Sequence, residues 1–203
     1  MKKFYIFDFD GTLVNTFYDS VIAYNKALRK YGFPEYSYES LEDIDYTDFI
    51  NSMTDNMQVL KSYSKIYEES DKEYTLPYEG MNDCLKELIK RGKTLAICSN
   101  RSQEQLNYYT QKLFPDIEFE YIVGYTPEGG YKPQPVVMNR ILNNVSYEKD
   151  EMVYIGDKKI DIITAQNVDL DVIIVTWGQG DKEAYEDSYP IRIIDSVEEL
   201  LDV

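Results

Sequence analysis

The sequence predicts an α/β fold in which a parallel-sheet core carries an inserted all-helical block. The chain opens on a short apolar run that is typical of a buried parallel strand. The residues that follow show helical spacing of apolar side chains and no convincing strand. Later, short apolar strands alternate with amphipathic helices, which is the pattern of a parallel sheet with right-handed crossovers. We therefore expect residues 1–14 and 77–203 to form the core and residues 15–76 to form a separate helical domain.

The first predicted strand runs directly into two acids. Residues 4–9 have the sequence FYIFDF, in which five of the six side chains are apolar or aromatic. Asp8 interrupts this run, and Asp10, Gly11 and Thr12 follow it. Carboxylates are costly to bury unpaired, and ligands of open α/β sheets bind at the carboxyl ends of the strands. The run therefore predicts a buried strand that ends at a functional site.

Residues 16–31 predict the first helix of the inserted block. Gly32 follows that helix as a stop signal. Two or three further helices are expected within residues 38–73, and Pro77 closes the block. The apolar side chains of the first helix recur at helical spacing, for example Phe17, Val21, Tyr24 and Leu28.

The rest of the chain predicts the sheet and the helices that cover it. Glycine, asparagine, proline and serine mark the expected helix ends. The expected helices are residues 80–91, 102–113, 133–142, 157–166 and 196–200. The expected strands are the apolar runs between them, at residues 94–98, 119–123, 152–155, 172–176 and 191–194.

The composition excludes several classes of function. The formal net charge is −16, which argues against nucleic-acid and anionic-membrane partners because these need basic patches. The chain has no histidine, which excludes Cys/His zinc sites and histidine-based triads. Its two cysteines, Cys84 and Cys98, are expected as buried apolar residues in a reducing compartment. Neither a signal peptide nor a spanning segment is evident, so we expect a cytoplasmic protein.

Polar side chains gather at the ends of three predicted strands. Each could serve only as a helix cap or a surface group, but the carboxyl ends of parallel strands share one edge of a sheet, so together they are expected to converge. A lysine in the loop before residues 133–142 is expected to reach the same edge. The converging residues are Asp8, Asp10 and Thr12, then Ser99, Asn100 and Arg101, then Asp157 and Asp161, with Lys132 from the loop.

This set of residues indicates phosphoryl transfer. Several carboxylates without a thiol or an imidazole suit a hard cation with oxygen ligands, so Mg²⁺ is the expected cofactor. Of Asp8 and Asp10, one can attack as a nucleophile and form an acyl phosphate. The other can protonate the leaving oxygen and later deprotonate water.

The remaining polar residues are expected to bind the metal and the phosphoryl group. Asp157 and Asp161, at i and i+4, are expected to share one face of a helix. Asp157 lies nearer the strand end and is the expected metal ligand, while Asp161 is expected to hold Lys132 or a metal-bound water. The expected phosphate binders are Thr12, Ser99, Asn100 and Lys132, with Arg101 as a candidate substrate contact.

Four motifs occur in order along the chain: DFDGTL at residues 8–13, Ser99-Asn100 after an apolar strand, Lys132-Pro133, and GDKKID at residues 156–161. Together they resemble the motifs of the haloacid dehalogenase superfamily of phosphatases. The resemblance implies a Rossmann-like core with a helical cap inserted after the first strand. It implies Asp8 as the nucleophile and Asp10 as the general acid and base. It also implies Ser99 and Lys132 as phosphate binders, and a Mg²⁺ site formed by Asp8, the backbone carbonyl of Asp10, and Asp157.

Two further stretches, Thr176-Trp177-Gly178 after a strand and residues 77–80, resemble the phosphoglycolate phosphatase-like branch in particular. The chain departs from that branch at Asn15-Thr16, where Asp-Ser is frequent, and at Asn167-Val168, where Ala-Gly is frequent. Asp10 argues against a true dehalogenase, whose second position is not acidic. Thr12 favours a phosphatase over a phosphomutase.

The sequence therefore predicts a Mg²⁺-dependent phosphatase that hydrolyses a small-metabolite phosphate monoester through a phospho-aspartate. Two alternatives stay open: a phosphomutase of a sugar phosphate, and a catalytically idle binding or regulatory protein. Residues 15–76 are expected to select the substrate, and no pattern indicates an oligomeric state. The polar candidates for substrate contact in that block are Asn25, Arg29, Asn51 and Asn56.

Overall fold

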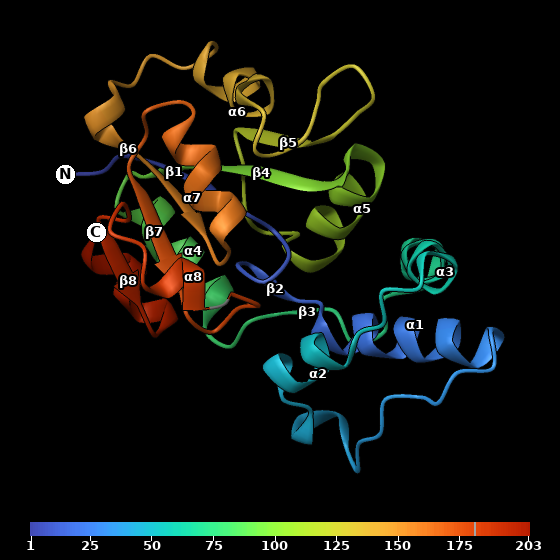
Figure 1. Cartoon of the computed structure of the whole chain (residues 1–203). Coiled ribbons are helices and arrows are strands. Elements are labelled where there is room, and N and C mark those ends of the chain that lie inside the picture. The colour runs from blue at the N-terminus through green and yellow to red at the C-terminus, as the bar shows by residue number, and fades with distance from the viewer. Residues whose placement is uncertain (181) are drawn as a thin grey trace. The chain divides into compact units, whose positions relative to one another are not determined.

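The computed structural model describes residues 1–180 and 182–203 (Figure 1). These residues divide into two units, one formed by Met1–Val14 with Pro77–Val203 and the other by Asn15–Leu76. A two-stranded sheet of β2 (Val14–Asn15) and β3 (Leu76–Pro77) marks the two points where the chain passes between the units. No helix in the described part of the chain has the length and apolar character needed to cross a bilayer.

A six-stranded sheet in the order β5-β4-β1-β6-β7-β8 forms the core of the first unit, and every neighbouring pair is parallel. The chain adds β4 and β5 on one side of β1 and the later strands on the other, so the strand order reverses at β1. Such a reversal is where ligands bind in open α/β sheets. The strands are β1 (Phe4–Phe7), β4 (Thr94–Ser102), β5 (Tyr121–Tyr125), β6 (Met152–Gly156), β7 (Val172–Val175) and β8 (Arg192–Ile194).

Helices cover both faces of this sheet (Figure 1). Within β1, Tyr5 and Phe7 pack into one core while Phe4 and Ile6 pack into the other, and all four side chains are fully buried. A strand covered on both faces needs such a continuous apolar run, and the predicted α/β fold class is confirmed. One face carries α4 (Met81–Lys90), α5 (Gln103–Leu113) and the 3-10 helix Val197–Asp202. The other carries α6 (Pro135–Leu142), α7 (Lys159–Gln166) and α8 (Lys182–Tyr185), and the 3-10 turn Lys149–Glu151 precedes β6.

The second unit is helical, with an aromatic core. The ring of Phe49 meets the rings of Phe17 and Tyr24 edge to face, at centroid distances of 5.6 and 5.5 Å. Such pairs stabilise a core beyond the area that they bury. The elements of this unit are α1 (Phe17–Lys30), the 3-10 turn Leu41–Asp43, α2 (Tyr46–Ser52) and α3 (Met57–Glu69).

Three of the four polar candidates in this unit have local partners. Asn25 exchanges two hydrogen bonds with the backbone of Tyr36, each 2.8 Å long. Arg29 forms an ion pair with Glu35 at 2.7 Å. Asn56 caps α3 by accepting hydrogen bonds from two backbone amides of its first turn. These contacts give all three side chains a part in the fold of the unit.

The observed element bounds differ from the predicted ones at two places that matter for function. β4 continues past Cys98 to Ser102, with a shift in its register against β5 between these residues. The polar stretch after Cys98 is therefore a bulged continuation of the strand and not a loop.

The second difference corrects a prediction. Because α7 begins at Lys159, Asp157 lies in the turn before it, and the prediction that Asp157 and Asp161 share a helix face is wrong. The amides that precede a helix lack intrahelical acceptors. The Asp161 carboxylate supplies one by accepting from the amides of Asp157 and Lys158 at 3.1 and 3.0 Å.

Asp19 in α1 bonds the segment at the carboxyl end of the second unit. Its side chain is buried and accepts hydrogen bonds from the Tyr74 amide at 3.2 Å and the Thr75 hydroxyl at 2.7 Å. We expect Asp19→Ala to lower the free energy of unfolding by about 1–3 kcal/mol, because it leaves these donors without an acceptor. Urea unfolding measures the loss, and hydrogen exchange locates it at the Tyr74 amide.

The matched control is Asp43→Ala. Asp43 is exposed and accepts from the Ser40 hydroxyl at 2.7 Å, so its replacement is expected to change the free energy of unfolding by less than about 0.5 kcal/mol. Equal losses in the two variants would contradict the role given to Asp19.

Candidate active site

Asp8 follows β1 directly and is buried beside a lysine. Its side chain lies at the carboxyl end of the central strand, and the residue is only 6% exposed. Its Oδ1 accepts the Phe9 amide at 2.7 Å and lies 2.9 Å from the Nζ of Lys132. Burial raises the pKa of Asp8 to about 6, while the Lys132 ammonium opposes the shift.

Lys132 comes from the loop before α6, and its ammonium lies among three oxygens. Nζ is 2.9 Å from Asp8 Oδ1, 2.8 Å from Asp161 Oδ1 and 3.1 Å from the Tyr154 hydroxyl. An ammonium has three N–H donors, and these three acceptors use all of them. Burial favours a lower pKa for Lys132, but the carboxylates of Asp161 and Asp8 outweigh it and raise the pKa above its ordinary value.

Asp161 accepts hydrogen bonds at both of its oxygens. Oδ1 accepts from Lys132 and from the Tyr154 hydroxyl, each at 2.8 Å, and Oδ2 accepts from the two amides that directly precede α7. A carboxylate offers about four lone-pair positions, so Asp161 has no capacity left for a metal. Burial would raise the pKa of Asp161, but the Lys132 ammonium outweighs it and lowers the pKa.

Asp157 has the opposite arrangement, because one of its oxygens lacks a partner. It follows β6 and is fully buried. Its Oδ2 accepts the Gln179 amide at 2.6 Å, whereas Oδ1 has no hydrogen-bond partner among the described residues. Burial raises the pKa of Asp157 to about 7. A buried oxygen of this kind is costly unless a ligand reaches it.

The donor set fits a divalent cation. One carboxylate oxygen from each of Asp8, Asp157 and Asp161 lies within 4.8 Å of the other two. Three carboxylates and the ammonium of Lys132 leave a net negative charge in this buried cluster, and the Lys158 ammonium only partly offsets it by opposing the rise in the pKa of Asp157. Mg²⁺ takes oxygen ligands and is bound through one or two carboxylates. Since the oxygens of Asp161 are already saturated, Asp8 and Asp157 are the pair that fits.

Asp10 and Arg101 form a separate ion pair. The guanidinium reaches both carboxylate oxygens, Nε at 3.0 Å from Oδ2 and Nη2 in contact with Oδ1. It also lies over the rings of Phe9 and Tyr109, with Cζ 5.6 and 5.1 Å from their centroids. Burial would raise the pKa of Asp10, but Arg101 outweighs it and lowers the pKa. Arg101 therefore contacts Asp10, the predicted general acid and base, and the Arg101 side chain is only 3% exposed.

Asn100 contacts the backbone of Lys132. Its Oδ1 accepts the Lys132 amide at 2.6 Å, and its Nδ2 donates to the Lys132 carbonyl at 3.2 Å. Both ends of the side-chain amide are thus engaged, and the contact fixes the loop that carries the lysine. Ser99 is buried, and its hydroxyl accepts the Arg101 amide at 3.3 Å.

Thr12 lies in the turn after Asp10. Its Oγ1 is buried and has no hydrogen-bond partner within the described residues, while its carbonyl accepts the Trp177 indole N–H at 3.1 Å. The unpartnered Oγ1 is a hydrogen-bonding group that the fold itself does not use.

Close backbone packing holds this edge of the sheet together. A Cβ on Gly178 would lie 2.1 Å from the Gly11 carbonyl oxygen and 2.5 Å from the Asp157 Cβ. A Cβ on Gly11, whose φ is +84°, would lie 2.2 Å from Asp157 Oδ2.

Sequence reasoning missed the Gln179 amide and the Tyr154 hydroxyl. The signal for the first was the pair Gly178 and Gly180 in the loop after β7, where glycines allow a close approach of the backbone.

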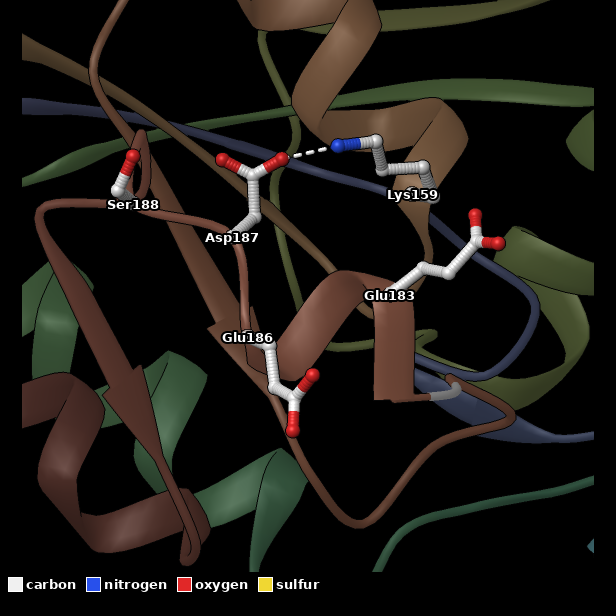
Figure 2. Close-up of a pocket in the computed structure, with 5 residues that line it drawn as sticks. All are labelled: Lys159, Glu183, Glu186, Asp187 and Ser188. Carbon is white, nitrogen blue, oxygen red and sulfur yellow. Dashed lines mark hydrogen bonds and ion pairs between the residues drawn. The ribbon is translucent and has the colours of Figure 1, made fainter.

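A pocket of about 410 Å³ opens elsewhere on the first unit (Figure 2). Figure 2 shows the Asp187 carboxylate turned toward the Lys159 ammonium, with which it forms an ion pair, while Glu183 lies on the lysine side and Glu186 points away. Its single cation is already paired, and none of the predicted site residues lines it. Its lining is Lys159, Glu183, Glu186, Asp187 and Ser188.

Comparison with known proteins places these features in a family context. A family model for haloacid dehalogenase-like hydrolases matches residues 5–175. A phosphoglycolate phosphatase of Vibrio vulnificus is 25% identical over 222 residues, covering 99% of this chain and 95% of the relative. A pyrophosphatase of Bacillus cereus is 24% identical over 206 residues, covering 98% and 94%. A solved structure from Lactobacillus delbrueckii, provisionally described as a phosphoglycolate phosphatase, has a TM-score of 0.82 and 27% identity, covering 98% of this chain and 97% of that one.

The contact between Asn100 and Lys132 yields a testable prediction. Asn100→Ala removes both hydrogen bonds to the Lys132 backbone, each worth about 0.5–1.5 kcal/mol. We expect the Lys132 amide to lose about 1–3 kcal/mol of protection in native-state hydrogen exchange. Asn144→Ala is the control, because Asn144 donates to the Arg140 carbonyl at 3.1 Å on the exposed surface. Unchanged protection at Lys132 in the Asn100 variant would contradict the contact.

Proposed function

The chain belongs to the haloacid dehalogenase-like hydrolases, and on that premise we propose that it is a Mg²⁺-dependent phosphatase of a small-molecule phosphate monoester. One observation carries the proposal: Asp8, Lys132 and Asp161 are joined in one buried cluster at the carboxyl edge of the sheet, with the unpartnered Oδ1 of Asp157 beside it. Its curated relatives include proteins named for phosphoglycolate and for pyrophosphate hydrolysis. We take phosphoglycolate as a candidate monoester substrate, and pyrophosphate, which is a phosphoanhydride, as an alternative substrate of the same site.

Asp8 and Asp157 are the side chains that we propose hold Mg²⁺, together with the backbone carbonyl of Asp10. The support is the net negative charge of the cluster and the Oδ1 of Asp157, which has no hydrogen-bond partner among the described residues. When bound, Mg²⁺ supplies positive charge that offsets the carboxylates and the phosphoryl oxygens.

Asp8 is the proposed nucleophile. The hydrogen bond and ion pair that the described residues make to its carboxylate both involve Oδ1, so we assign the attack to Oδ2. The bond from Oδ2 to phosphorus forms as the bond from phosphorus to the leaving oxygen breaks, which gives an acyl phosphate and an alcohol. Ser99 and Thr12 are the proposed hydrogen-bond donors to the phosphoryl oxygens, where negative charge develops. Lys132, whose N–H groups are taken by Asp8, Asp161 and Tyr154, is proposed to bind the phosphoryl group through the positive charge of its ammonium.

Asp10 is the proposed general acid and base. In the first step it gives a proton to the leaving oxygen. In the second step it takes a proton from water, the water oxygen attacks phosphorus, and inorganic phosphate leaves as the Asp8 carboxylate is restored. Because Arg101 holds Asp10 in the ionised form, the contact favours the second step, and Asp10 must loosen from Arg101 to act as an acid.

The second unit, residues 15–76, is the proposed cap domain and the source of substrate selection. Active-site closure by such a unit excludes bulk water from the site. The local partners of Asn25, Arg29 and Asn56 leave other side chains of this unit to contact the leaving group. Arg101 we now propose as a partner of Asp10 and not as a substrate contact.

A panel of phosphate esters, together with the phosphoanhydride pyrophosphate, tests the proposal. Purified protein with Mg²⁺ is incubated with p-nitrophenyl phosphate, phosphoglycolate, sugar phosphates, nucleotides and pyrophosphate. We expect released inorganic phosphate from at least one monoester, and loss of this activity when the metal is chelated. An isomerised sugar phosphate without free phosphate would instead support a mutase, and Mg²⁺ binding without any product would support an idle regulatory protein.

Asp8→Asn is the variant for this panel. It keeps the size of the side chain and removes the nucleophilic oxygen, so we expect turnover to fall at least about 10³-fold, while the circular dichroism spectrum stays that of the parent. The control is Asp43→Asn, which changes an exposed carboxylate in the second unit and is expected to retain the parent rate. Retained turnover in the Asp8 variant would exclude Asp8 as the nucleophile.

A further inference from the structure

Tyr154 contacts the catalytic cluster from within the sheet. It lies on β6, its ring is part of the core beneath α6 and α7, and the residue is fully buried. Its hydroxyl lies 2.8 Å from Asp161 Oδ1, 3.1 Å from Lys132 Nζ and 3.2 Å from the Cys98 carbonyl oxygen. A buried tyrosine hydroxyl requires one partner, which the Cys98 carbonyl alone would provide. The contacts with Lys132 and Asp161 exceed what the fold needs.

The protons of this network can be assigned from the donor inventory. The Tyr154 hydroxyl has one hydrogen, and the nearest and only charged acceptor for it is Asp161 Oδ1. Its oxygen is then free to accept an N–H from Lys132. A second N–H of Lys132 goes to Asp161, and the last one is left for Asp8 Oδ1. Each ammonium proton therefore has one acceptor.

We propose that Tyr154 is a positioning residue for Lys132. Together with Asp161 it takes two of the three ammonium N–H groups, and so it directs the third toward Asp8. The inference deepens the proposed function, since Asp8 is where the phosphoryl group would react. Without the Tyr154 hydroxyl, the ammonium would have a buried N–H with no acceptor and would be held in direction by Asp161 and Asp8 alone.

The variant Tyr154→Phe removes this hydroxyl and keeps the ring in the core. Tyr5→Phe is the matched control: Tyr5 is also fully buried, lies on the adjacent strand β1, and donates its hydroxyl to the Val203 carbonyl at 3.1 Å. The two substitutions remove the same atom from neighbouring strands, so loss of a buried hydroxyl as such affects both. Only Tyr154→Phe changes the surroundings of Lys132.

The first readout is the exchange of the Lys132 ammonium protons with water, followed by ¹⁵N NMR of lysine-labelled protein. The Lys132 signal is assigned through its contacts with the Tyr154 ring, whose centroid is 5.8 Å from Nζ. We expect about tenfold faster exchange in Tyr154→Phe, the equivalent of one lost hydrogen bond. In Tyr5→Phe we expect a change of less than about twofold.

The second readout is kcat/KM for the best monoester of the panel, together with competitive inhibition by inorganic phosphate. We expect Tyr154→Phe to lower kcat/KM about tenfold and to weaken phosphate inhibition, with both quantities near the parent values in Tyr5→Phe. Unchanged ammonium exchange in Tyr154→Phe, or equal losses of activity in the two variants, would overturn the inference. If the parent hydrolyses no ester, the proposed function fails, and the ammonium exchange alone decides the role of Tyr154.

Discussion

Lys132 lies between Asp8 and Asp161, and all three side chains are buried. Removal of one partner from such a group leaves an uncompensated buried charge, which costs about 3–5 kcal/mol. Three separate elements must therefore each present their group at one point: β1 presents Asp8, the loop before α6 presents Lys132, and the first turn of α7 presents Asp161. The reversal of strand order at β1 provides that point, because the carboxyl ends of the neighbouring strands β4 and β6 lie on either side of β1 there. The same cluster retains an excess of negative charge, and we propose that Asp157 completes it as a site for a dication.

Much of the fold followed from local patterns. The apolar run of β1 indicated burial on both faces, and the alternation of strands and helices indicated a parallel sheet. The convergence of Asp8 and Asp157 could also be predicted, because parallel strands place their carboxyl ends on one edge of the sheet. Contacts between segments that are far apart in the sequence could not be predicted in this way. Nothing local indicates that Asn100 bonds the backbone of Lys132, 32 residues later, or that the Tyr154 ring carries its hydroxyl to the same lysine.

The helix predicted for residues 157–166 begins only at Lys159, and the reason lies in how it is capped. Helix bounds depend on how the first amides are capped, and here the cap is Asp161, from inside the helix and not before it. Arg101 illustrates a second difficulty. A cation beside a predicted phosphate site suggests a substrate contact, yet its guanidinium is planar and two-pronged, and the nearest match for it is the Asp10 carboxylate. The same difficulty applies to the polar side chains of the second unit. Asn25 and Asn56 were candidate substrate contacts, yet both bond the backbone of their own unit.

As the proposed nucleophile, Asp8 becomes phosphorylated during turnover. An acyl phosphate can be reduced by borohydride, which would convert Asp8 to homoserine. Protein quenched during steady-state turnover of its best substrate, then reduced and digested, would be analysed by mass spectrometry of the peptide that contains β1 and Asp8. We expect homoserine at position 8 only when substrate and Mg²⁺ are both present. Homoserine at another carboxylate, or none at all under conditions where phosphate is being released, would contradict it.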